Sequence, residues 1–155
     1  MSDVPVWLRD PIGTAKRGEN PTVLARTKSG LAVIGATQFL PGYCLLLAVP
    51  KFARLEDMPR DHRALFLEEM GLLGEAVSRV CEPLRVNYSI YGNTDAYVHA
   101  HVFPRYDWEP AERKPGPVWL YPREMWSDPA HAFDETKHGD LKAKIAAALK
   151  DVAKL

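Results

Sequence analysis

This sequence contains few cysteines, no long apolar run and no excess of charge of either sign. Its two cysteines, Cys44 and Cys81, lie far apart in apolar surroundings, which argues against a disulfide framework or a CxxC motif and predicts two reduced core thiols. The longest apolar stretch, 44–50, is far too short to cross a bilayer. Twenty Lys and Arg residues balance twenty Asp and Glu residues, so the overall charge gives no reason to expect a nucleic-acid partner.

Residues 1–5 carry neither the basic region nor the apolar core of a signal peptide. We therefore expect a cytoplasmic protein without a membrane partner, in keeping with reduced cysteines. A length of 155 residues and a hydrophobic content of 46% suit a single domain over 1–155.

The spacing of apolar residues predicts an α+β domain built on an antiparallel β-sheet. Segments with strand character cover 22–27, 31–35, 43–49, 85–91 and 97–103. The last two strands are expected to be antiparallel neighbours because the loop between them is short. Helical periodicity within 55–81 predicts one long amphipathic helix, whose start is marked by Pro59 and Asp61 and whose end is marked by Glu82-Pro83. A second helix is predicted at the C-terminus over 141–155. Gly71 and Gly74 inside the long helix could allow another element to approach its backbone closely.

The remaining segments are predicted to be irregular. An arm covers 1–21, and a proline-rich loop covers 107–129. The core of the domain therefore spans 22–106, and the C-terminal loop and helix occupy 107–155.

The segment 97–105, YVHAHVFPR, holds two of the five histidines. Because side chains alternate along a strand, His99 and His101 are expected to share a face, about 6.5–7 Å apart along the strand. The apolar residues between them are expected to pack on the other face and to anchor the strand. Pro104 cannot donate to a β-ladder and is expected to end the strand. Both imidazoles can then act on one ligand.

Two imidazoles on one face can divide the work of a phosphoryl reaction. A neutral ring is a nucleophile, and a protonated ring binds phosphate or acts as an acid. Two other interpretations remain open. The pair could be satisfied histidines on a sheet surface, or two ligands of a metal site completed by Asp95, Asp107 or His131.

The block 87–106, NYSIYGNTDAYVHAHVFPRY, resembles the signature of the histidine-triad superfamily, His-φ-His-φ-His-φ-φ with φ apolar. It is most similar to the branch related to diadenosine polyphosphate hydrolases, in which Pro-Arg follows the triad. The upstream order agrees with this resemblance: a strand pair, Pro41-Gly42, an apolar strand that ends in Val49-Pro50-Lys51, and a helix. The resemblance covers 22–106.

The resemblance implies an antiparallel sheet with packed helices, a homodimer, and a nucleotide or nucleoside polyphosphate as ligand. By position, His99 is the middle histidine, which attacks the α-phosphorus and forms a nucleotidyl-histidine intermediate for hydrolysis or nucleotidyl transfer. His101 is the last histidine, expected to bind the phosphate and assist. Asn93 is a polar phosphate contact, and Thr94 is a hydroxyl residue near the leaving group. This chemistry requires no metal or organic cofactor, although magnesium could accompany the substrate phosphates.

The sequence departs from the family pattern at three positions. Tyr97 occupies the first triad position, Tyr43 follows Pro41-Gly42 where the family commonly has histidine, and Gly35 stands where several relatives carry an acidic or amide residue. We hypothesise that Tyr43 and Tyr97, both expected in the substrate site, touch each other. A phenol supplies no imidazolium charge, so the alternative function is nucleotide binding with weak or no turnover.

Cationic and aromatic residues near the block each have two interpretations. Arg105 either contacts phosphate, for which a guanidinium is suited, or forms a surface ion pair. Trp108, Trp119 and Trp126 are expected to anchor the long loop by packing rather than to stack on a base. Phe39 is a further candidate for a base pocket.

Overall fold

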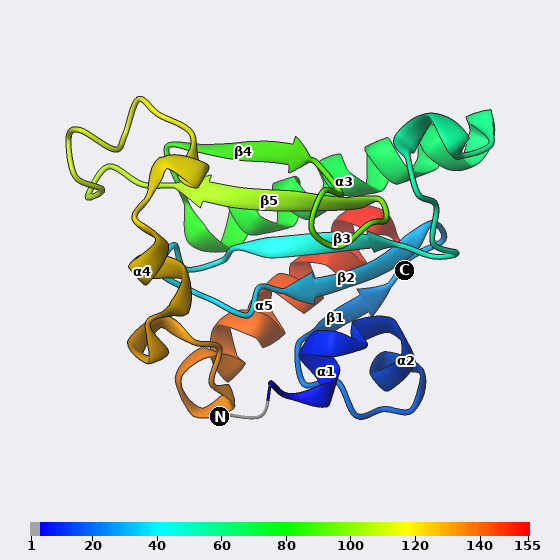
Figure 1. Cartoon of the computed structure of the whole chain (residues 1–155), viewed down its shortest axis with the longest axis horizontal. Helices are drawn as coiled ribbons and strands as arrows, with labels where there is room; N and C mark the ends of the chain where they lie inside the picture. The colour runs from blue at the N-terminus through cyan, green and yellow to red at the C-terminus, as the bar shows by residue number, and fades with distance from the viewer. Residues whose placement is uncertain (1–3) are drawn as a thin grey trace.

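The computed structural model describes residues 4–155, and its centre is a five-stranded antiparallel sheet. The strands lie in the order β1-β2-β3-β5-β4 (Figure 1), which confirms the α+β fold and the pairing of the last two strands. Their bounds are β1 Val23–Arg26, β2 Gly30–Ile34, β3 Cys44–Ala48, β4 Arg85–Ile90 and β5 His99–Arg105.

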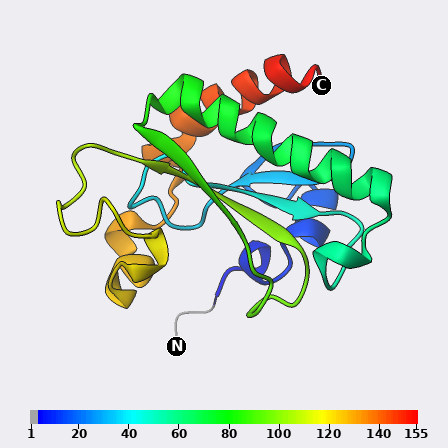
Figure 2. The ribbon, with the colours of Figure 1, turned by 90° about the horizontal axis from the view of Figure 1, so that it is seen from above.

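Two long helices, α3 (Arg60–Cys81) and α5 (Glu135–Ala153), cover one face of the sheet and pack against each other (Figure 2). The main core lies between these helices and the strands. Its buried residues include Val98, Ala100 and Val102 from the histidine segment and Phe66, Leu73, Val77 and Ile145 from the helices. The histidine strand is therefore anchored by its apolar face, as predicted. Within residues 4–155, no helix has the length and apolarity that a membrane span needs.

One long helix begins where the sequence predicts, and the other begins earlier. α3 starts at Arg60, directly after the predicted start signal Pro59, and the residues Leu55–Asp57 before it form a separate 3-10 turn, η1. Pro59 accounts for the break, because the residue before a proline avoids helical conformation. α5 starts at Glu135 rather than at 141, since the side chain of Asp134 caps it by accepting a hydrogen bond from the N–H of Lys137.

The two segments predicted to be irregular contain short helices on the opposite face of the sheet (Figure 2). The arm forms α1 (Val6–Arg9) and α2 (Pro11–Lys16), and its residues 1–3 lie outside the described part. The loop 107–129 contains η2 (Val118–Leu120) and α4 (Arg123–Ser127), and η3 (Pro129–His131) follows. Each of these elements begins at a proline or directly after one. The fixed φ of proline suits the start of a helix.

The histidine strand occupies a different range from the one predicted. β5 begins at His99 instead of Tyr97 and continues through Pro104 to Arg105. Pro104 is tolerated because β3 ends opposite Val102, so only the edge strand β4 still pairs with β5 at this position. The backbone oxygen of Arg105 accepts a hydrogen bond from the N–H of Leu84, on the β4 side.

The close approach that the helix glycines were expected to allow occurs at Gly74. A Cβ at this position would overlap the hydroxyl and ring of Tyr88 on β4, whereas a Cβ on Gly71 would point into open space. Gly74 therefore lets α3 pack tightly on the sheet, and Gly71 has no such role.

These two glycines give a matched stability test. Gly71→Ala should stabilise the protein by about 0.5–1 kcal/mol, because alanine has the higher helix propensity. Gly74→Ala should destabilise it by about 1–3 kcal/mol through overpacking, and adding Tyr88→Ala should recover part of that loss. Urea unfolding measures all three variants. Equal effects of the two glycine substitutions would contradict the packing argument.

Candidate functional site

The two histidines lie on the sheet face that α3 and α5 leave open. His99 pairs with Leu47 of β3, and His101 pairs with Leu45. Their ring centroids are 4.9 Å apart at an interplanar angle of 68°. The predicted shared face is confirmed, and the rings approach each other more closely than the backbone spacing along the strand.

A cavity of about 240 Å³ opens at this pair. His99, His101, Tyr43 and Tyr97 all line it. The apolar part of its wall comes from the sheet and the N-terminal arm and includes Val33, Leu45, Leu47, Trp7 and Leu8. The cavity therefore combines two imidazoles with an apolar surface, so the pair is neither fully packed over nor on a flat surface.

The orientation of the His99 ring is fixed by one backbone contact. Its Nδ1 lies 2.8 Å from the carbonyl oxygen of Tyr97. A carbonyl can only accept a hydrogen bond, so Nδ1 must carry the proton and donate it. In the neutral ring the lone pair then resides on Nε2. His99 is only 8% exposed, so its ring has little room to rotate toward another hydrogen-bond partner.

His101 is held in an aromatic enclosure. The Tyr43 hydroxyl is 2.7 Å from its Nδ1, and the Trp119 ring meets it edge-on at 4.8 Å. Burial, and secondarily the charge of His99, lower the pKa of His101 to about 4. Burial also raises the pKa of the Tyr43 phenol far above its usual value. At neutral pH the pair is therefore an uncharged imidazole bonded to a protonated phenol.

The two unexpected tyrosines each contact a different histidine. The Tyr43 ring stacks on the Phe103 ring with centroids 4.0 Å apart, and its hydroxyl is hydrogen-bonded to His101. The Tyr97 ring contacts the His99 ring, with centroids 5.3 Å apart. The ring contacts among residues 4–155 include none between Tyr43 and Tyr97, so the hypothesised contact is not seen there.

A different pair of departures from the family pattern is coupled. A Cβ on Gly35 would overlap the ring of Tyr43. The backbone N–H of Gly35 donates to the Tyr43 carbonyl at 2.8 Å. Tyrosine at 43 thus requires glycine at 35, which leaves no side chain there to meet a ligand.

The loop between β4 and β5 places the two predicted polar contacts differently. Thr94 lines a second cavity of about 450 Å³, which shares Leu8, Pro11, Asp95 and Tyr97 with the histidine cavity. Asn93 is exposed and lines a separate depression beside Arg54 and Ile90. Thr94 is therefore adjacent to the histidine cavity, and Asn93 faces elsewhere.

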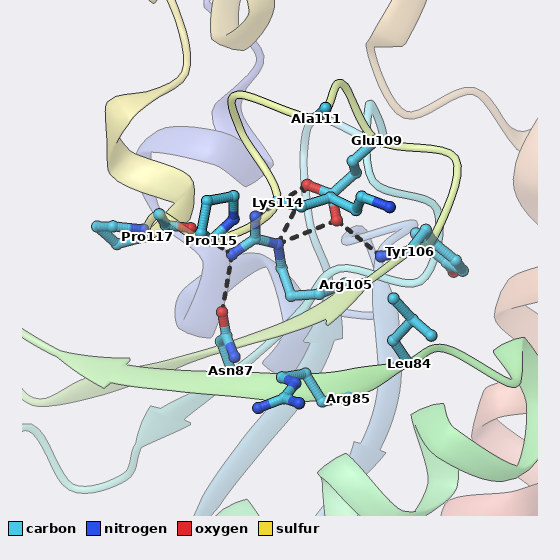
Figure 3. A pocket seen from close by; sticks show the side chains of 11 residues that line it. Leu84, Arg85, Asn87, Arg105, Tyr106, Glu109, Ala111, Lys114, Pro115 and Pro117 are labelled. Carbon is cyan, nitrogen blue, oxygen red and sulfur yellow. Dashed lines mark hydrogen bonds and ion pairs between the residues drawn. The ribbon is translucent and has the colours of Figure 1, made fainter.

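Arg105 lies on the same sheet face as the histidines, but its hydrogen bonds are all made to other groups of the protein. Its guanidinium donates to both carboxylate oxygens of Glu109 and to Asn87 Oδ1 (Figure 3). It also donates to the backbone carbonyls of Gly116 and Arg113. These bonds use all five of its N–H groups. The ion pair is buried, with Arg105 5% exposed, so neither a surface pair nor a free phosphate ligand describes it. A cavity of about 730 Å³ adjoins this cluster and not the histidines.

Glu109 completes this buried cluster. Burial alone would raise the pKa of its carboxyl, but hydrogen bonds from Arg105, Tyr121 and the backbone of Tyr106 outweigh that and hold it below its usual value. The ionised carboxylate thereby ties the start of the long loop to the end of β5.

The described residues do not provide a third ligand for a metal site at the two histidines. Across residues 4–155, no three His, Cys, Asp or Glu side chains gather closely enough to hold an ion. Of the suggested additional ligands, Asp107 pairs with Lys114 and His131 lies near Asp128.

The aromatic residues of the long loop mainly pack. Trp119 and Trp126 stack on each other at 5.0 Å, and Phe39 lies in the cluster of Tyr121 and Trp126. Trp126 also lines the histidine cavity, whereas Trp108 is exposed and stacks on Tyr106.

Sequence reasoning missed two contributors to the cavity. Trp7 of α1 lines it, and the apolar run Val6-Trp7-Leu8 in a polar arm is the signal that could have indicated this. Thr37 lines it as well, and its buried Oγ1 has no hydrogen-bond partner within the described chain. No local pattern distinguishes Thr37 from other loop threonines.

Comparison with known proteins supports the fold. No family model and no curated protein matches the chain. A histidine-triad protein from Marinobacter aquaeolei matches with a TM-score of 0.70 and 22% identity, over 88% of this chain and 95% of that one. A histidine-triad protein from Sinorhizobium meliloti matches with a TM-score of 0.70 and 18% identity, over 86% of this chain and 93% of that one. Plasmodium falciparum diadenosine triphosphate hydrolase matches with a TM-score of 0.61 and 14% identity, over 84% of this chain and 78% of that one. The chain therefore has the fold of histidine-triad proteins.

The Arg105 cluster predicts a sharp contrast in stability. Arg105→Ala leaves the Glu109 carboxylate buried and unpaired and should destabilise the protein by about 3–5 kcal/mol. Lys114→Ala removes only an exposed ion pair with Asp107 and should cost about 1 kcal/mol or less. Guanidinium unfolding distinguishes the two, and a small effect of Arg105→Ala would show that the buried pair does not hold the loop.

Proposed function

We propose that this protein binds a nucleoside phosphate in the histidine cavity and cleaves nucleoside polyphosphates or nucleotidyl conjugates at the α-phosphorus through His99. One observation carries the proposal. His99 donates from Nδ1 to the Tyr97 carbonyl, which leaves the Nε2 lone pair of a ring that lines the cavity beside His101. A fixed imidazole with a free Nε2 is a preorganised nucleophile.

The proposed reaction has two steps. In the first, the Nε2 lone pair of His99 forms a bond to the α-phosphorus, and the bond from phosphorus to the leaving group breaks with its electron pair on the leaving atom. In the second, water attacks the same phosphorus and the P–N bond breaks. The nucleoside monophosphate departs, the ring recovers its lone pair, and one proton is released. Transfer to another acceptor replaces water in the second step.

Other residues of the cavity assist in this scheme. The N–H of neutral His101 donates to a phosphate oxygen, since the ring carries no charge at neutral pH. Tyr97 acts through its backbone carbonyl, which orients the His99 ring, and its side chain supplies no imidazolium charge. The apolar wall and Trp7 accommodate the nucleoside, and Thr37 Oγ1 offers the ligand an otherwise unused hydrogen-bonding group.

The proposed substrate is suggested by a protein with the same fold. A fold neighbour is a diadenosine triphosphate hydrolase, and we propose a diadenosine polyphosphate as a substrate of this chain. The proposed steps use no metal or organic cofactor. Magnesium would enter only with the substrate phosphates.

We also propose that the chain forms a homodimer through β4. This edge strand pairs on one side with β5 and, among residues 4–155, with no strand on the other. Leu84, Tyr88 and Tyr91 are exposed on or beside it. A strand edge flanked by apolar side chains favours pairing with a second copy.

The catalytic proposal is tested by incubating the protein with a diadenosine polyphosphate and measuring AMP release. His99→Ala should lower the rate by roughly 10³-fold or more, because the nucleophile is lost. His138→Ala, which alters a histidine outside the cavity, should retain the wild-type rate. Tight binding of the substrate by wild type without AMP release would instead support the binding function and refute catalysis.

The dimer is tested by light scattering. Wild type should show twice the 17.4 kDa chain mass. Leu84→Asp should shift the population to monomer, while Leu155→Asp should not, because Leu155 is also exposed but follows α5, which packs on β1 at the opposite edge of the sheet. A wild-type monomer at high concentration would refute the interface.

A further inference from the structure

The second cavity beside the histidine site has a distinct chemical character. Arg9, Lys51 and Thr94 line it, together with Asp95 and an apolar remainder. Asp95 is its one acidic residue, so cations outnumber anions in its wall. The histidine cavity, in contrast, has no lysine or arginine in its wall.

Tyr97 forms the boundary between the two cavities. Its ring lies 5.3 Å from the His99 ring, centroid to centroid. Lys51 Nζ lies 4.5 Å from the same Tyr97 centroid. The ammonium is thus separated from the proposed nucleophile by a single aromatic side chain, close enough to act on the same ligand.

The two cations are available for a ligand. Neither Arg9 nor Lys51 forms an ion pair with any carboxylate of residues 4–155. Both are exposed at the cavity rim, so their attraction for an anion is expected to be modest individually and sensitive to salt.

We infer that this second cavity, lined by Arg9, Lys51 and Thr94, holds the leaving half of the substrate and selects a leaving group that is an anionic phosphate chain. The inference rests on the proposed function, because it takes attack by His99 as given. It assigns Lys51 and Arg9 as specificity-determining residues, and it makes nucleoside polyphosphates preferred over nucleotidyl amides.

The protonation states around His99 support this selection. An amine leaving group needs a proton as the P–N bond breaks. His101 is uncharged at neutral pH, and burial together with Asp95 and Asp10 raises the pKa of Tyr97 to about 12. Neither group is a ready acid. A phosphate chain needs no proton, since the breaking P–O bond leaves its electron pair on a phosphate oxygen. The added negative charge is stabilised by nearby cations.

The experiment compares two substrates that share an adenylyl group, a diadenosine polyphosphate and adenosine 5′-phosphoramidate. The double variant Arg9→Ala, Lys51→Ala should lower kcat/KM for the polyphosphate roughly tenfold and leave the phosphoramidate within about twofold. Lys16→Ala, a cation that lines a different cavity, should change neither. The polyphosphate preference of wild type should also shrink as salt is raised.

Two outcomes would overturn the inference. Equal losses on both substrates would show that the cations serve binding or folding in general. Unchanged kinetics on both would show that the second cavity does not hold the leaving group.

A binding measurement separates this inference from the proposed function. If wild type turns over neither substrate, the catalytic proposal fails, and calorimetry with ATP and AMP then decides the role of the cavity. ATP binding more tightly than AMP, with the difference removed in the double variant, supports a phosphate-chain site. Equal affinities, or a difference that the double variant retains, refute it.

Discussion

The hydrogen bond from His99 Nδ1 to the carbonyl of Tyr97 determines what this site can do. It fixes the ring and leaves the lone pair on Nε2. The bond in turn depends on the fold, because Val98, Ala100 and Val102 hold the strand in the core while β3 and β4 pair with it on both sides. Residue 97 therefore orients the proposed nucleophile through its backbone, which a tyrosine can do as well as a histidine. The identity of the side chain at position 97 does not affect this interaction.

The three departures from the family pattern change the charge of the site rather than its framework. Tyr43 bonds and shields His101, which stays neutral, and its ring occupies the space that a side chain at position 35 would fill. The wall around the histidines thus carries no fixed positive charge. Lys51 and Arg9 stand at the neighbouring cavity instead. In the proposed function, the nucleophile therefore has cations on its leaving-group side only, and the charge of the substrate is recognised at the leaving group rather than at the attacked phosphorus.

The sequence allowed the sheet, the two long helices and the shared face of His99 and His101 to be predicted, because alternation and helical periodicity are local properties. The start of α3 could be predicted from Pro59, whereas the start of α5 was missed because the cap formed by Asp134 lies before the apolar periodicity begins. What could not be predicted depends on contacts between distant segments. Glu109 follows Arg105 closely in the sequence, but no local pattern shows that the loop folds back and buries both side chains. The packing of Trp7 over the cavity and the exclusion of a side chain at Gly35 by Tyr43 are likewise tertiary effects.

Nuclear magnetic resonance can locate the proton of the His99 ring directly. Long-range ¹H–¹⁵N correlation of uniformly labelled protein near pH 7, with His99→Gln to assign the signal, reports which ring nitrogen is protonated. We predict that the neutral form of the His99 ring carries its proton on Nδ1 and shows a pyridine-like shift for Nε2. A proton on Nε2, or rapid averaging between the two nitrogens, would mean that the Tyr97 carbonyl does not fix the ring, and the preorganised nucleophile would be refuted.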